Sequence, residues 1–216
     1  MTEIDIHRPQ RRVRKQNRKP SRIAQERRRD LIEAAIRDIA ENGYDKVTVS
    51  SICEKAGFSR GLIGHYFSSK DALLLEAVRA MAEQLGSAIR DAANQAGPNT
   101  SDRLHALITA SFTPPGCTQE NMAVWVALTG TARWSPPLAA LYREIWRDYR
   151  AGVGRLFARA AEGRKKTIDV EQTALSFSQL VEGLWIGCNA DPEAVSTASA
   201  EACCHAFVRA VLGEDA

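Results

Sequence analysis

Apolar positions recur with a helical period along most of the chain. Between Ile23 and Ala40, apolar side chains return every three or four residues, and the sequence ENGY at 41–44 ends the run. No segment alternates apolar and polar residues between hairpin turns, as a half-buried strand would. The pattern therefore predicts an all-α protein.

Breaks in this periodicity divide the rest of the chain. They are AGPNTSD at 96–102, TPPGC at 113–117, SPP at 135–137, GRKK at 163–166 and ADPE at 190–193. We expect further helices near 49–56, 60–66, 69–93, 102–112, 119–131, 137–161, 169–189 and 193–212, about nine with the first. The fourth joins a three-helix head, residues 21–68, to a larger helical body, residues 69–216.

Charge is concentrated at the start of the chain. The first 29 residues carry eleven Lys and Arg against three acids, a net +8, although the whole chain carries only +3. Such a split favours a polyanionic partner at this end, while a solvated tail is the alternative. Residues 1–20 are expected to form a flexible basic arm that raises DNA affinity through phosphate contacts without specifying sequence.

Cysteine usage indicates a reduced, cytoplasmic protein, which would associate with the nucleoid if its polyanionic partner is DNA. The five cysteines form no C-x-x-C pair and have no metal-ligand spacing with the four histidines, so we expect no metal and no cofactor. The start of the chain has charge but no apolar signal core, and no apolar run approaches the ~20 residues of a membrane span.

The stretch TVSSICEKAGFSRGLIGHYFSSKDALL, residues 48–74, predicts a helix-turn-helix. This motif needs a small residue in its first helix, a left-handed turn residue and apolar residues that pack the second helix on the first. Cys53 is the small residue and Gly57 the turn. The packing set is Ile52, Phe58, Leu62 and Phe67. Thr48 and Ser59 are expected to cap the two helices.

The residues left over in this stretch are expected to face DNA. Gly61 and Gly64 each cost roughly 1 kcal/mol in a helix, which suggests close approach of the backbone to a groove; tight helix packing is the alternative. Arg60 suits a guanine edge or a phosphate, and His65 a base, the backbone or no partner. Helix N-termini with Lys70 suit phosphates. The predicted DNA contacts are Thr48, Ser59, Arg60, Gly61, Ile63, Gly64, His65, Tyr66 and Lys70.

Residues 25–75 resemble the TetR family of bacterial transcriptional repressors. The resemblance lies in T-v-x-x-I, A-G-x-S with a glycine two residues later, an H/Y-F pair, S-K and L-L, although Cys53 replaces the usual alanine and Phe58 a smaller residue. The ending GHYF resembles the BetI-like, choline-responsive branch. The resemblance implies a homodimer on a palindromic operator, released by a small ligand that binds in the body and moves the fourth helix.

The resemblance also implies that the last two helices of each subunit form the dimer interface. Small residues are frequent in both helices, and small residues allow close helix approach. The expected contacts are Leu175, Gln179, Phe207 and Val211. Packing of the same surfaces within one subunit is the alternative.

Aromatic residues in the body indicate a ligand pocket. An aromatic cage with a carboxylate holds quaternary ammonium groups, and the candidate carboxylates are Glu182, Asp148 and Glu144. The segment VEGLWIGC at 181–188 resembles the BetI-like segment, with Glu182 where aspartate is usual. A second aromatic expected near Thr129 is missing. The predicted ligand residues are Trp125, Trp134, Tyr142, Trp146, Tyr149, Phe177, Glu182 and Trp185. A plain hydrophobic core, or an uncharged hydrophobic inducer, fits the same residues.

Two other classes of function fit the sequence less well. A nucleoid-type DNA-compacting protein would not need so large a body. An enzyme would need a nucleophile–base spacing, a phosphate-binding glycine loop or a metal motif, and the sequence has none. We therefore expect a DNA-binding regulator that is not an enzyme.

Overall fold

The computed structural model describes residues 21–213, so the predicted basic arm lies outside the described residues. Within that range all regular structure is helical, which confirms the all-α prediction. The helices are α1 (Arg22–Asn42), α2 (Val49–Ala56), α3 (Ile63–Tyr66), α4 (Lys70–Gln95), α5 (Thr100–Phe112), α6 (Gln119–Ala132), α7 (Pro136–Gly163), α8 (Val170–Ala190) and α9 (Thr197–Leu212). Short 3₁₀ turns occupy Tyr44–Lys46 and Arg60–Leu62.

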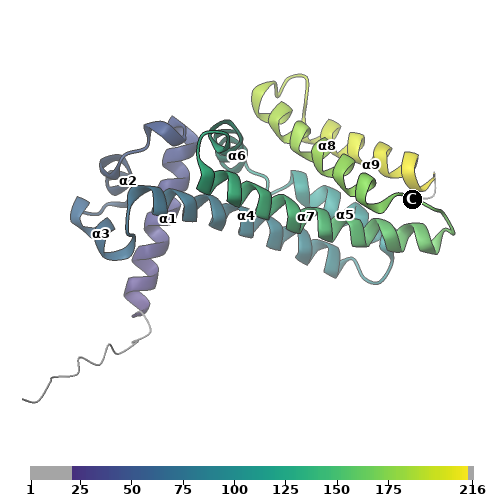
Figure 1. Cartoon of the computed structure of the whole chain (residues 1–216), viewed down its shortest axis with the longest axis horizontal. Coiled ribbons are helices and arrows are strands. Elements are labelled where there is room, and N and C mark those ends of the chain that lie inside the picture. The colour runs from purple at the N-terminus through teal and green to yellow at the C-terminus, as the bar shows by residue number, and fades with distance from the viewer. Residues whose placement is uncertain (1–20, 214–216) are drawn as a thin grey trace, which may run out of the picture.

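The molecule is elongated, with the three-helix head at one end (Figure 1). Helices α4 and α7 both run from the head side toward the far end, and α8 and α9 lie together along the body (Figure 1). Helix α1 packs against both α4 and α6 as well as α2. The division between head and body near residue 68 therefore stays a prediction, because the buried core continues from α1 into the body.

Local capping explains where several helices begin and end. The hydroxyl of Ser21 accepts a hydrogen bond from the Ala24 amide at 3.2 Å, and Gly57 takes the left-handed conformation, with φ 70°. The left-handed conformation of Gly57 confirms the sequence prediction. Helix α9 begins at Thr197, four residues later than expected, because Ser196 is its cap and accepts from the Ser199 amide.

The third predicted helix, residues 60–66, is broken into two pieces. Arg60–Leu62 form a 3₁₀ turn, and only Ile63–Tyr66 are α-helical. Two glycines in seven residues disfavour a regular α-helix, which explains the tighter opening turn. Ser59 stands at its cap position, but its side chain makes no capping hydrogen bond.

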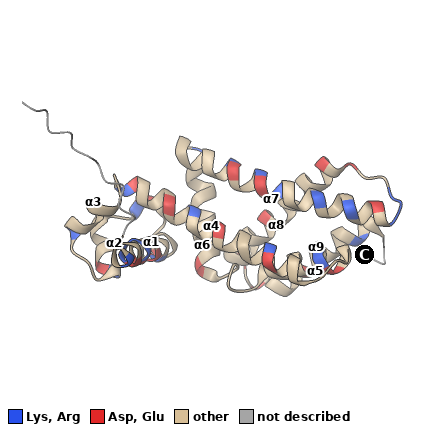
Figure 2. Cartoon of the chain, turned by 90° about the horizontal axis from the view of Figure 1, so that it is seen from below, with Lys and Arg blue, Asp and Glu red and all other residues tan. Residues whose placement is uncertain are grey.

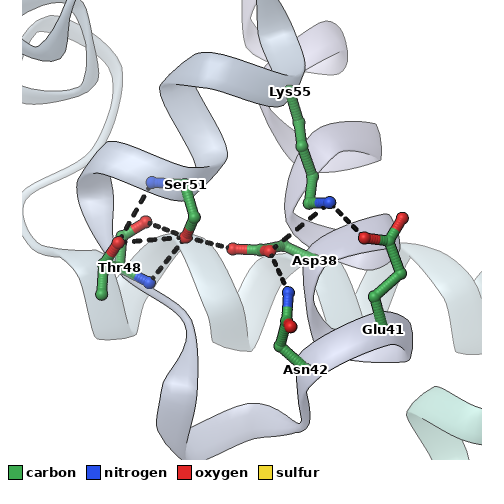
Figure 3. Close-up of polar contacts among 6 residues, drawn as sticks. All are labelled: Asp38, Glu41, Asn42, Thr48, Ser51 and Lys55. Atoms are coloured by element: carbon green, nitrogen blue, oxygen red, sulfur yellow. Dashed lines mark hydrogen bonds and ion pairs between the residues drawn. The ribbon is translucent and has the colours of Figure 1, made fainter.

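A buried polar network fixes α2 against α1 (Figure 3). The Asp38 side chain is fully buried and accepts hydrogen bonds from Asn42 Nδ2, at 2.8 Å, and from the Ser51 hydroxyl. Ser51 also belongs to the capping box of α2, in which it exchanges hydrogen bonds with Thr48. Lys55 Nζ lies 3.7 Å from the Asp38 carboxylate and also pairs with Glu41. The start of α2 is therefore positioned by α1.

Candidate functional site

The head presents most of the predicted DNA-contacting residues on its outer surface. Thr48, Ser59, Arg60 and His65 are exposed, and Tyr66 is half-buried. Gly61 and Gly64 are exposed too, and a Cβ added at either would meet nothing within 4 Å. Tight packing within the described chain therefore does not explain these two glycines. The surface they leave is open to close approach by a partner.

Ile63 corrects the predicted DNA-contacting set. Its side chain is only 4% exposed and belongs to the core of the head, whereas the sequence analysis placed it on the partner-facing side. The 3₁₀ turn before it winds at three residues per turn instead of 3.6, and this changes the angular position of the residues that follow. Leu62, which was expected in the core, is half-buried.

Two predicted phosphate contacts already have partners within the head. The Thr48 hydroxyl accepts from the Ser51 amide at 3.0 Å, and Lys70 Nζ donates to the Val47 carbonyl at 3.0 Å. Ser69 caps α4 by accepting from the Ala72 amide. These bonds hold the N-terminal ends of α2 and α4 near one another, and their role toward phosphate stays a prediction.

A cavity of about 430 Å³ lies in the body, walled chiefly by α4 and α7 with contributions from α5, α6 and α8. Four of the predicted aromatic residues line it: Trp125, Trp146, Tyr149 and Trp185. The rings of Trp146 and Trp185 stand edge-on to Trp125, with centroids 5.6 and 6.2 Å away. Tyr149 stands edge-on to Trp146 at 5.3 Å. The structure therefore brings together predicted ligand residues from three different helices.

Several polar groups in this cluster have no hydrogen-bond partner among residues 21–213. They are the indole nitrogens of Trp125 and Trp146 and the hydroxyl of Tyr149, all buried. Trp185 differs, because its indole nitrogen donates to the Ser111 carbonyl at 2.9 Å. A buried donor without a partner is costly, so these groups suit a ligand that brings acceptors or water.

Glu182 is the carboxylate of the cluster, and its side chain is almost wholly buried, with 8% exposed. The Tyr142 hydroxyl lies 2.7 and 2.8 Å from its two oxygens, and Gln179 Nε2 donates at 3.2 Å. Burial, and then the hydrogen bond to Glu182, raise the pKa of Tyr142, which keeps the phenol protonated as the donor. No ion pair joins Glu182 to a cationic side chain within the described range.

Three predicted ligand residues lie outside the cavity lining. Trp134 follows α6, is 78% exposed and stacks under the Arg133 guanidinium, 5.3 Å from the ring centre. Phe177 is fully buried against Phe157 and Phe207, so it is a core residue. Tyr142 is not part of the lining, but it stacks on Trp125 and donates a hydrogen bond to Glu182, both of which line the cavity. Aromatic composition does not show which way a ring points, which is why Trp134 and Phe177 were wrongly placed.

The arginines of the cavity wall were not predicted from the sequence, whereas Glu144 and Asp148, two of the candidate carboxylates, do line the cavity. Arg79 and Glu144 form a two-point ion pair between α4 and α7, with nitrogen–oxygen distances of 2.6 and 3.0 Å. This hydrogen bond lowers the pKa of Glu144. The other arginines of the lining are Arg90, Arg103, Arg155 and Arg159. The arginines on α4 and α7 recur at helical spacing, which was a detectable signal, but the same spacing is equally typical of a solvated helix face.

The outer surface of α8 and α9 holds the predicted dimer contacts. Leu175 is 42% exposed and Gln179 is exposed, whereas Phe207 and Val211 are half-buried against the core. Ile186, on the same helix as Leu175, is a further exposed apolar side chain, and Ala206 is exposed on α9. None of the helices in residues 21–213 has both the length and the apolar character needed to cross a bilayer.

A helix-turn-helix head joined to a helical body with an aromatic cavity is the architecture of a DNA-binding transcriptional regulator. Residues 31–77 match the family model for the bacterial regulatory proteins of the tetR family. Residues 100–213, just over half of the chain, match the BetI-type transcriptional repressor C-terminal model. The chain therefore belongs to the TetR family of transcriptional regulators, in its BetI-type branch.

Individual relatives agree with this assignment. The chain is 31% identical to the HTH-type transcriptional regulator BetI of Stenotrophomonas maltophilia over 163 residues, 74% of this chain and 80% of that protein. It superimposes on a putative transcriptional regulator from Pseudomonas aeruginosa PAO1 with a TM-score of 0.79 and 28% identity, covering 88% and 92% of the two chains. A regulator from Saccharomonospora viridis, solved in complex with choline, gives a TM-score of 0.75 at 24% identity over 86% and 96%.

Proposed function

We propose that this regulator is a homodimeric repressor that binds a palindromic operator and is released by a small quaternary ammonium compound of the choline type. The observation that carries the ligand class is Glu182, a buried carboxylate that has no counter-ion among residues 21–213 and lies beside four cavity-lining aromatic rings. A buried charge is costly unless paired, and a cation held by the ring faces would pair it. The choline bound to the Saccharomonospora viridis regulator is consistent with this ligand class.

Choline would contact two kinds of group in the cluster: the aromatic rings with their carboxylate, and the buried hydrogen-bond donors. Its trimethylammonium lacks N–H donors, so it gains from aromatic faces and a carboxylate and needs no hydrogen-bond acceptor. Its hydroxyl oxygen would accept from a buried donor, for which the unpartnered Tyr149 hydroxyl or the indole nitrogens of Trp125 and Trp146 are available. The same rings would also stabilise an uncharged apolar inducer, but that ligand would leave Glu182 unpaired.

The dimer would form through the outer faces of α8 and α9. Leu175 and Ile186 on α8 are exposed, and few other large apolar side chains between residues 21 and 213 are. On α9 most of the exposed residues are small, among them Ala198, Ala202, Cys203, Ala206 and Ala210, and Arg209 is the large exception. Small residues let a partner's helices approach closely, and two such helices from each subunit would bury the apolar side chains that one subunit leaves in water.

Two helices connect the cavity to the head. Helix α4 lines the cavity through Arg79 and packs against α1, and α6 carries Trp125 and also packs against α1. Arg28 of α1 pairs with Glu76 of α4 and lies 4.8 Å from the ring centre of Phe67, which ends the recognition segment. A ligand that moves α4 or α6 would thereby tilt the head. Half-sites about 34 Å apart make the dimer sensitive to such a change, with coupling of about 1–3 kcal/mol.

The test is binding of the purified full chain to DNA from upstream of its own gene, with random DNA of equal length in parallel, during titration with choline. We expect a footprint over two half-sites, a large preference over random DNA, and loss of the footprint as choline rises. Equal affinity for both DNAs would favour the nucleoid-type alternative. Specific binding that choline leaves unchanged would keep the regulator and remove this ligand class.

A further inference from the structure

The charged residues of the cavity wall are sorted by sign along the cavity. Helices α4 and α7 both run away from the head (Figure 1), and the Arg79–Glu144 pair fixes their register. All carboxylates of the lining lie in the half nearer the head: Glu83, Glu144, Asp148 and Glu182. Arg79 is the one arginine of the described lining in that half. The others lie toward the far end: Arg90, Arg103, Arg155 and Arg159.

Bonds between helices support this placement. Glu182 of α8 is bound by Tyr142, near the start of α7, which sets it in the half nearer the head. Arg103, at the start of α5, donates to Asn94 Oδ1 on the last turn of α4 at 2.9 Å, which sets it at the far end. Figure 2 shows basic positions along the second half of α7, where Arg155 and Arg159 lie.

The arginines at the far end have no acidic partner in the part of the chain that the structure describes. The ion pairs of residues 21–213 include Arg79 but none of Arg90, Arg103, Arg155 and Arg159. Arg103 is half-buried, and its Nε is buried without a hydrogen-bond partner. Several guanidinium groups around one end of a cavity attract a carboxylate, which they can bind in bidentate fashion.

The cavity is also larger than choline requires. If each non-hydrogen atom takes roughly 30 Å³, the volume of one molecule in liquid water, the seven non-hydrogen atoms of choline occupy about 210 Å³. This is about half of the 430 Å³ cavity. The far end, with its arginines, would stay empty. On α7, Arg155 lies six positions after Tyr149 and Arg159 lies ten positions after it. These offsets correspond to about 9 and 15 Å along the helix axis.

We propose that the natural effector is a zwitterion, with a trimethylammonium group at the aromatic end and a carboxylate held by the arginines at the far end. The proposal rests on the proposed function, because it assigns the cation to the same cage. At about 1.3 Å of advance per carbon–carbon bond, the two charges are separated by a spacer of roughly six to ten methylenes. Such a ligand pairs Glu182 and the arginines at once and fills the cavity between them.

The test compares trimethylammonium alkanoates with trimethylammonium alkanols of matched length, by calorimetric titration of the full-length protein at low salt. With one or two methylenes the acid should bind no better than the alcohol, because its carboxylate lies among the cavity's acids. With about eight methylenes the acid should bind about fivefold tighter, a modest factor because Arg155 and Arg159 are exposed. In a variant with both Arg155→Gln and Arg159→Gln, the long acid and the long alcohol should bind with equal affinity.

Arg143→Gln is the matched control, because Arg143 is an exposed residue of α7 outside the cavity lining. It should keep the preference for the long acid. If the alcohols bind and the acids never bind better at any length, the zwitterion is excluded while the ammonium-responsive regulator stands. If no ammonium compound binds, both proposals fail. A preference for the long acid that survives in the double variant would also overturn the role of the arginines.

Discussion

Replacing Glu182 by glutamine isolates the contribution of its charge to ligand binding. The carboxylate is buried, and Tyr142 and Gln179 hold it in place. Glutamine has the same shape and keeps an oxygen that accepts from Tyr142, so the cage geometry should survive. The aromatic faces also remain, and they continue to attract the cation. The change therefore removes the negative charge and little else.

The magnitude follows from the geometry of the site. Two opposite charges about 4 Å apart attract by roughly 4 kcal/mol at an effective dielectric constant of about 20. The Tyr142 and Gln179 hydrogen bonds already stabilise the carboxylate in the free protein, so we take about half of that value. A loss of about 2 kcal/mol weakens binding about 30-fold.

The assay is calorimetric titration of choline into the Glu182→Gln protein, with operator affinity measured in parallel. Choline affinity should fall about 30-fold while DNA affinity stays unchanged, because Glu182 lies on α8, in the body and outside the DNA-contacting head. Glu171→Gln is the control, since Glu171 is an exposed residue of the same helix. Equal choline affinity in wild type and Glu182→Gln would refute the assignment of Glu182 as the counter-ion.

Three further changes test other parts of the structure. Asp38→Ala removes the acceptor of the network that joins α1 to α2 (Figure 3) and should lower the free energy of unfolding, measured in urea, by about 2–3 kcal/mol. Ala206→Glu should give monomers in light scattering and weaken operator binding. His205→Gln should lessen the loss of stability in acid, because burial and His105 lower the pKa of His205 below 6.5. The unfolded chain then binds more protons, so wild-type stability falls as pH drops below about 6.5.

Each change has a matched control. Asp45→Ala, at an exposed position of the head, should alter stability by less than about 0.5 kcal/mol. Ala151→Glu, on the exposed side of α7, should leave the dimer intact. For His205 the informative comparison is the same protein at pH 7.5, where wild type and variant should show no proton-linked difference. Parallel stability curves for the two proteins from pH 7.5 to 5 would show that His205 does not carry this effect.

Features set by neighbouring residues were predictable from the sequence. The Thr48 cap, the left-handed Gly57 and the breaks between helices depend on residues within one turn of each other. The predicted cavity residues on α6, α7 and α8 converge because apolar faces of adjacent helices must meet in the core. The exposed Gly61 and Gly64 stood out because glycine is costly in a helix.

Features set by side-chain direction or by distant pairing were not predictable. A single 3₁₀ turn moved Ile63 from the surface to the core. Trp134 and Phe177 share the composition of the cavity residues but point elsewhere. The burial of Asp38 depends on partners that include Ser51, thirteen positions away, and the sorting of charges in the cavity depends on the register of α4 against α7. None of these features can be predicted from the spacing of apolar and polar residues along the chain.

The most direct test of the ligand site is a crystal structure of the protein with choline bound. We expect the trimethylammonium nitrogen within about 6 Å of the ring centres of Trp125 and Trp146, next to the Glu182 carboxylate. We also expect a hydrogen bond between the choline hydroxyl and one of the buried donors that lack a partner in the described chain. Choline bound away from Glu182, or a cavity without choline at saturating concentration, would refute the proposed ligand site.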